Sequence, residues 1–130
     1  MTRTLFFGEV PMMIRELFCV VKRVYNEVLK CVRPHCEVST LDRVAREMMG
    51  DKEKLFLHSL GHGVGLDVHE YPSISQKTKK VRLEVGMVIA IEPGLYLPGV
   101  GGVRYEDMLV ITQTGYQNFF EGKVPPKYSP

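Results

Sequence analysis

The chain of 130 residues carries a formal net charge of +2, and 45% of its residues are hydrophobic. We expect one domain over residues 1–130 with an ordinary core and no nucleic-acid partner, because acidic and basic residues are interspersed. No apolar run approaches the roughly 20 residues of a bilayer span, and no signal-peptide pattern opens the chain, so we predict a cytoplasmic protein without a membrane partner.

The N-terminal region has the pattern of a strand followed by a long helix. Thr2 to Phe7 has the composition of a short strand, and residues 8–11 form a turn. From Ile14 to Val32, apolar residues recur at spacings of three and four, which predicts an amphipathic helix that Pro34 ends. We expect this helix to act as scaffold.

A second, shorter amphipathic helix is predicted after residue 38. Ser39 is its expected N-cap, and Asp42 three residues on completes a variant capping box. Gly50 stands where a helix C-cap belongs. Residues 51–54 are then a charged connection.

Three cysteines, Cys19, Cys31 and Cys36, fall within these helices and their junction. Their number is odd and they show no C-x-x-C spacing, so we predict reduced packing residues, with Cys19 on the apolar face of its helix. Cys31, His35 and Cys36 could form a metal cluster, but the second ligand pair that such a site needs is missing.

The most informative stretch of the chain is His58-Ser-Leu-Gly-His62-Gly-Val-Gly-Leu-Asp-Val-His69-Glu70. Its glycines permit backbone conformations and close approaches that other residues forbid. Residues 66–69 alternate apolar and polar, which predicts a loop that enters a strand. Neutral imidazole is the commonest metal ligand in proteins, so the three histidines are candidate site residues.

The C-terminal half alternates loops and strands. A polar loop is expected over 73–80, a buried strand over 87–91 and a last strand region over 103–112. The tail, about 122–130, is expected to be disordered or loosely docked.

Two carboxylates accompany these strands. Glu92 ends the apolar strand, where a carboxylate is costly unless it is paired, protonated or bound to metal. Strand alternation puts Arg104 and Glu106 on one face, and Tyr105 and Asp107 on the other. An Arg104–Glu106 surface ion pair is the simpler interpretation of that block taken alone. Together with the central histidine, however, the two glutamates suit a divalent ion such as Mn²⁺, Zn²⁺, Co²⁺ or Fe²⁺.

The histidine stretch, Glu84-Val-Gly-Met-Val-Ile-Ala-Ile-Glu92-Pro-Gly and Gly102-Val-Arg104-Tyr-Glu106-Asp107 resemble, in order and spacing, the blocks of the pita-bread metallopeptidases. The last block is more similar to Xaa-Pro aminopeptidase and prolidase than to methionine aminopeptidase. The resemblance implies an α+β pita-bread (creatinase/aminopeptidase-like) fold, in which helices back a curved antiparallel sheet. It also implies a peptide substrate with proline at the second position.

The resemblance further implies roles for individual residues. His62, Glu92 and Glu106 would be metal ligands of a site that holds two ions, most simply Mn²⁺, with a metal-bound hydroxide as nucleophile. His58 and His69 would contact substrate, and His69 would also stabilise the oxyanion. Glu92 would pass a proton to the leaving nitrogen, and Arg104 would orient its neighbouring carboxylate.

One departure from the family pattern stands out. The family site has two further aspartate ligands, the second just before a strand that resembles Met1-Thr-Arg-Thr. We therefore expect this chain to be the C-terminal portion of a catalytic domain, with the N-terminal part missing. We also expect it to bind metal poorly, to be inactive alone and to form homo-oligomers.

Two alternative functions remain open from the sequence. An inactive pseudo-peptidase that binds peptides could share this fold, although such relatives usually lose the ligands that are present here. A purely structural domain would leave the polar cluster unexplained.

Overall fold

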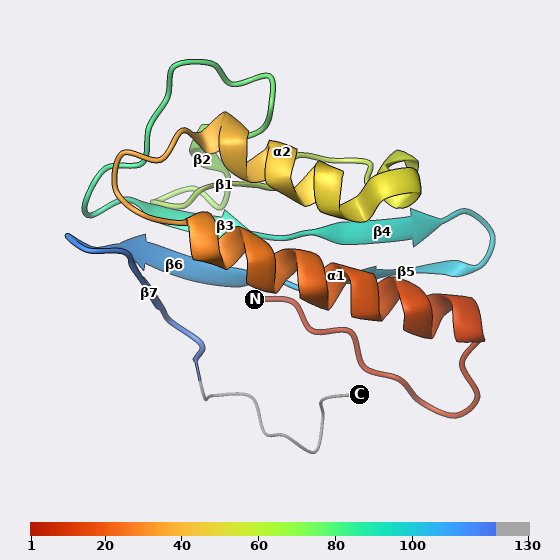
Figure 1. Cartoon of the computed structure of the whole chain (residues 1–130). Coiled ribbons are helices and arrows are strands. Elements are labelled where there is room, and N and C mark those ends of the chain that lie inside the picture. The colour runs from red at the N-terminus through yellow and green to blue at the C-terminus, as the bar shows by residue number, and fades with distance from the viewer. Residues whose placement is uncertain (122–130) are drawn as a thin grey trace.

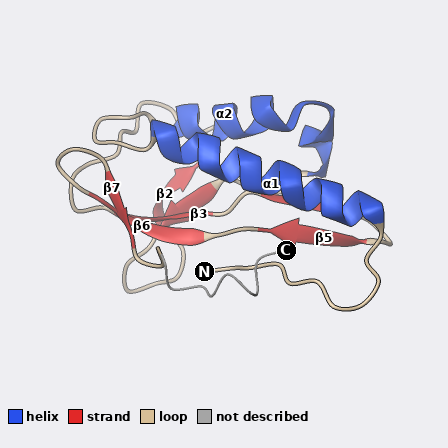
Figure 2. Ribbon diagram, turned by 60° about the horizontal axis from the view of Figure 1, so that its bottom comes forward, coloured by secondary structure: helices blue, strands red, loops and turns tan. Residues whose placement is uncertain are grey.

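The computed structural model describes residues 1–121 and has two layers, a pair of helices and a layer of antiparallel strands (Figures 1 and 2). The predicted tail, 122–130, lies outside the described residues. Both helices cover the same face of the strand layer, which confirms the α+β class and the sheet backed by helices. The elements are α1 (Met12–Cys31), α2 (Val38–Met49), the 3-10 helix η1 (Gly50–Leu55), β1 (Gly61–Gly63), β2 (Glu70–Ile74), β3 (Val88–Ile91), β4 (Gly94–Leu97), β5 (Gly101–Arg104), β6 (Asp107–Ile111) and β7 (Tyr116–Asn118).

Helix α1 confirms the predicted amphipathic helix. It follows Pro11, and its apolar stripe is buried against the strands and α2. The placement of Cys19 was wrong, because this residue is exposed between the buried positions Phe18 and Val21. All three cysteines are free, as predicted.

Helix α2 begins differently from the prediction. It starts at Val38, with Glu37 at the N-cap and no side-chain capping bond, so Ser39 is already inside the helix. Asp42 is fully buried and bonds to other segments, which explains why it does not serve a capping box. Gly50 ends the helix with φ of 57°, a conformation that favours glycine, as predicted.

The strands form a five-stranded sheet in the order β2-β1-β3-β6-β7 and a separate two-stranded sheet, β4-β5. β3 leads into β4, and β5 leads into β6. The β3–β6 pair and the β4–β5 pair are therefore successive parts of one long antiparallel ladder (Figure 1). Pairing stops after Ile91↔Asp107 and resumes at Gly94↔Arg104. Glu92 and Pro93 therefore face Tyr105 and Glu106 across the interruption, where the Tyr105 amide donates to the Pro93 carbonyl at 3.2 Å.

Two strand predictions were wrong. The N-terminal segment makes only an isolated bridge, Thr2↔Glu106, instead of a strand over 2–7. Residues 66–69 form an exposed loop between β1 and β2, with Leu66 and Val68 largely in solvent. Among residues 1–121 no second layer lies over these two side chains, so alternation alone does not make this segment a strand.

One continuous apolar core joins both helices to both sheets, with Val21, Leu41, Ile91 and Leu109 among its fully buried members. It occupies the space between the helix layer and the strand layer. Within residues 1–121, no helix combines the length and apolar character needed to cross a bilayer.

Candidate metal centre

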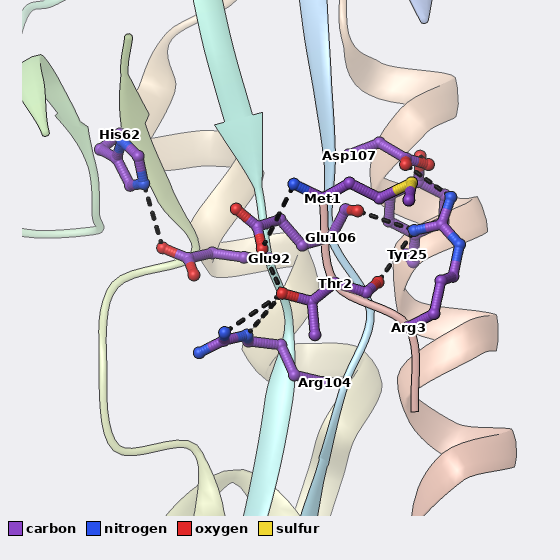
Figure 3. A network of polar contacts seen from close by, with 9 residues as sticks. All are labelled: Met1, Thr2, Arg3, Tyr25, His62, Glu92, Arg104, Glu106 and Asp107. Carbon is purple, nitrogen blue, oxygen red and sulfur yellow. Dashed lines mark hydrogen bonds and ion pairs between the residues drawn. The ribbon is translucent and has the colours of Figure 1, made fainter. Parts of the chain in front are cut away.

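Three potential ligands converge on the sheet face opposite the helices. One donor atom each of His62, Glu92 and Glu106 lies within 4.8 Å of the other two. His62 belongs to β1, while the glutamates stand where β3 and β6 reach the interruption (Figure 3). Ile89 and Ile91 point into the core, so the alternation of β3 directs Glu92 away from it.

The His62 ring is oriented by its own backbone. Nδ1 lies 2.9 Å from the Gly63 carbonyl oxygen, which can only accept, so Nδ1 carries the proton. Nε2 then faces the site, 3.5 Å from Glu92 Oε1. This is the arrangement that metal-binding histidines adopt, in which the second nitrogen donates to a carbonyl and fixes the ring.

The backbone of Glu92 is held between neighbouring strands. Its amide donates to the Leu60 carbonyl at 2.8 Å, just before β1 begins. β1 pairs with β3 on the adjacent residues, Gly61↔Ile91 and His62↔Ala90. The side chains of His62 and Glu92 are therefore fixed on one face of the sheet.

Glu106 is held by the N-terminal segment and Arg104. The Thr2 hydroxyl donates to Glu106 Oε2, and Arg104 Nε and Nη2 approach the same hydroxyl at 3.2 and 3.1 Å (Figure 3). Arg104 and Glu106 do lie on one face, as predicted, but the Thr2 hydroxyl stands between them. Arg104 thus acts on the carboxylate through Thr2.

The next residue, Asp107, faces the helices and anchors the same strand from behind. Its carboxylate is buried and accepts from Arg3 and Tyr25 at 2.6 Å each, and from Asn118 at 3.1 Å. Burial, together with the hydrogen bond and charge of Asp107, raises the pKa of Tyr25 far above its ordinary value. The strand that presents Glu106 is therefore tied to α1 and to β7.

The other two predicted site histidines flank His62. His58 Nδ1 donates to the Ser59 carbonyl at 2.8 Å, which leaves Nε2 to accept from the Tyr96 hydroxyl at 2.9 Å. The exposed His69 ring lies beside His62 at a centroid distance of 4.2 Å, tilted by 45°.

An open cavity of about 420 Å³ joins these histidines to Glu92 and Arg104. A second cavity, of about 250 Å³, is lined by His62 and Glu106 together with Val64 and Met108. The candidate centre thus borders two open cavities.

The donor set fits a divalent ion. One imidazole, whose Nδ1 is committed to a carbonyl, and two carboxylates meet at one point, where the N-terminal ammonium of Met1 also lies 3.9 Å from Glu106 Oε2. The mixed nitrogen and oxygen ligands suit Mn²⁺, Fe²⁺, Co²⁺ or Zn²⁺ and exclude a thiolate zinc site.

Sequence reasoning missed Thr2 as a partner of Glu106, Tyr25 as a partner of Asp107 beside Glu106, and Tyr96 as a partner of His58. The first two contact residues that are more than eighty positions away, so no local pattern could reveal them. Tyr96 lies two residues after the end of the second block, and its position near that motif was the one available signal.

Comparisons with known proteins agree with this geometry. A family model described as Metallopeptidase family M24 matches residues 1–113. An uncharacterized peptidase from Staphylococcus aureus is 40% identical over 119 residues, which are 90% of this chain and 34% of that protein.

Solved structures of peptidases are also similar to this chain. The prolidase from Pyrococcus furiosus is similar with a TM-score of 0.85 and 41% identity, over 89% of this chain and 35% of that one. The X-Pro aminopeptidase from Thermotoga maritima MSB8 gives a TM-score of 0.83 and 35% identity, over 89% and 33%. The fold is therefore the pita-bread fold, and the chain spans about a third of the length of these relatives, corresponding to their C-terminal part.

Proposed function

Because this chain belongs to metallopeptidase family M24, we propose that it supplies His62, Glu92 and Glu106 as metal ligands in a metal-dependent peptidase that cleaves the bond between an N-terminal residue and proline. The observation that carries the proposal is the convergence of the three donors within 4.8 Å, with the His62 Nδ1 proton committed to a carbonyl. An inactive pseudo-peptidase would have no need of this arrangement.

The preference for proline rests on the third sequence block and on the relatives. Gly102-Val-Arg104-Tyr-Glu106-Asp107 resembles the prolidase and Xaa-Pro aminopeptidase type, and similar solved structures bear those names. We further propose that the ion is manganese and that the complete site holds two ions. We also propose that the protein is a homo-oligomer and lies in the cytoplasm.

We assign a separate role in the reaction to each site residue according to its position. His69, exposed beside His62, can donate to the scissile carbonyl oxygen as negative charge develops there. Glu92 can carry a proton to the leaving nitrogen. His58 lines the same cavity and can contact substrate, while Arg104 orients Glu106 through Thr2. When bound, a divalent ion supplies Lewis acidity and lowers the pKa of a coordinated water.

Metal binding can be measured on the chain itself. In a calorimetric titration with Mn²⁺, we expect weak binding that is abolished by Glu106→Gln and His62→Ala and retained by Glu121→Gln, which alters an exposed carboxylate. Equal binding by all four proteins would reject the ligand assignment. We expect no turnover by the 130-residue chain alone, because the resemblance implies two further aspartate ligands.

Substrate preference requires a longer protein. We suggest a chimera in which this chain replaces the matched part of the Pyrococcus furiosus prolidase, to which it is 41% identical. The chimera should hydrolyse Xaa-Pro dipeptides and lose this activity with Glu92→Gln. Equal or faster cleavage of Met-Ala would contradict the proposed specificity.

A further inference from the structure

We propose that Asp42 and Arg46 of α2 are positioning residues that fix the backbone on both sides of Ser59 and thereby set His58 and the ligands His62 and Glu92. Neither residue touches the candidate metal centre. The importance of the pair rests on the function proposed above, but its geometric effect can be tested separately.

Asp42 joins two segments to α2. Its side chain is fully buried, and Oδ1 accepts the Leu60 amide at 3.1 Å. Oδ2 accepts the Gln76 amide at 2.9 Å and Arg46 Nε at 2.9 Å. The carboxylate thus ties the residue before β1 to the second residue after the end of β2.

Arg46 completes the connection one helical turn later. Its Nη2 donates to the His58 carbonyl at 2.9 Å, and its guanidinium lies 4.7 Å from the centre of the Phe56 ring. Burial alone would lower the pKa of Arg46, but the hydrogen bond and charge of Asp42 raise it, so the guanidinium keeps its charge. Glu53 contacts the same group at 3.3 Å from η1.

These contacts reach the candidate centre through single residues. Arg46 holds the carbonyl of His58, whose ring lines the cavity. Asp42 holds the amide of Leu60, and the carbonyl of Leu60 accepts the Glu92 amide at 2.8 Å. Leu60 therefore connects α2 to Glu92, through its amide on one side and its carbonyl on the other. The ligand His62 follows Leu60 by two positions.

A buried ion pair is a poor source of stability, since desolvation offsets most of the attraction. What this pair supplies is fixed geometry, because Asp42 Oδ1 bonds to the Leu60 amide and Arg46 Nη2 to the His58 carbonyl, one on each side of Ser59. Residues that orient metal ligands in this way typically change metal affinity about 10- to 100-fold when substituted.

The test uses the full chain, metal-free and 15N-labelled. Asp42→Asn leaves one acceptor oxygen where two carboxylate oxygens now accept, and Arg46→Lys retains the charge but not the planar fork. The matched controls are Asp51→Asn and Arg43→Lys, both at exposed positions of the same region. We expect the ring-nitrogen signals of His58 and His62 to move in both variants and in neither control. The affinity for Mn²⁺ should fall about 10-fold or more.

The outcomes separate three cases. If the melting temperature falls while the imidazole signals and Mn²⁺ affinity match the wild type, the pair is structural only and the inference is overturned. If the wild type binds no Mn²⁺, the proposed function fails, and the imidazole signals alone still decide the positioning role. If Asp42→Asn does not fold by circular dichroism, Arg46→Lys decides it.

Discussion

Two histidines of the candidate site use their ring nitrogens in the same way. His58 and His62 each donate Nδ1–H to the carbonyl of the following residue, so both present Nε2 outward. The two rings then meet different partners, the Tyr96 hydroxyl and the Glu92 carboxylate. The same local geometry therefore directs the two rings toward different partners.

Replacing Tyr96 by phenylalanine should remove the donor to His58 and leave the ring in place. We expect the 15N signal of His58 Nε2 to move while that of Nδ1 stays, with a loss of about 1 kcal/mol in stability. Tyr71→Phe, at an exposed ring, is the control. An unchanged Nε2 signal would show that the tyrosine does not donate to this histidine.

Tyr25 should make the protein sensitive to alkali. Its folded-state pKa is raised by burial and by Asp107, whereas an unfolded tyrosine titrates near about 10. Above that pH the unfolded chain loses a proton that the folded chain keeps. The contribution of Tyr25 to the free energy of unfolding is therefore fully present below about pH 10 and falls above it, by at most about 1.4 kcal/mol per pH unit.

Urea denaturation between pH 8 and 11 measures this slope. Tyr25→Phe should flatten it, while costing about 1–3 kcal/mol at neutral pH because Asp107 loses a donor. Tyr71→Phe should keep the wild-type slope. The same slope in wild type and Tyr25→Phe would exclude Tyr25 as its origin.

At the scale of elements, the short strand β1 depends on its glycines. A Cβ at Gly61 would stand 1.9 Å from the Ala90 carbonyl oxygen, and one at Gly63 would stand 2.3 Å from that of Tyr71. Both oxygens belong to backbone that cannot yield easily, because β1 is paired on both sides.

Gly61→Ala should therefore destabilise the protein by about 3 kcal/mol, at the upper end of overpacking effects. The control is Gly115→Ala, where a Cβ would meet nothing within 4 Å. Urea midpoints and slopes of both variants give the comparison. A loss for Gly61→Ala no larger than for Gly115→Ala would mean that β1 adjusts its spacing freely.

The sequence predicted elements where one period ran for many residues, as in α1, or where an apolar run was fully buried, as in β3. It failed where a tertiary contact overrode the local pattern. Asp42 looked like part of a capping box because its real partners, Leu60 and Gln76, lie far along the chain. Residues 66–69 had the alternation of a strand but pair with no strand of the described part of the chain and are exposed there.

The same division holds for the candidate site. The three ligands could be proposed because each lies in a distinctive motif. Thr2, which bonds to Glu106, and Arg46, which bonds to the His58 carbonyl, have nothing in the sequence around them that predicts these contacts. A hydrogen bond between residues a hundred positions apart, such as that of Thr2 with Glu106, depends on the folded topology.

At the scale of the whole molecule, one core joins the helices to both sheets, so we expect the chain to behave as one domain. Leu41→Ala, in the middle of that core, should cost about 2–5 kcal/mol. Far-ultraviolet circular dichroism and tyrosine fluorescence should still report the same urea midpoint. Two separate midpoints would show that the β4–β5 sheet unfolds independently.

The alternation around the strand interruption has an evolutionary consequence. Val103, Tyr105 and Asp107 face the helices, while Arg104 and Glu106 face the candidate metal centre. A mutational scan can score cellular abundance and catalysis separately. Substitutions at the odd positions should lower abundance, and substitutions at the even positions should lower catalysis. Selection for a new chemistry can therefore act on every second residue here, with little penalty in the amount of protein that accumulates.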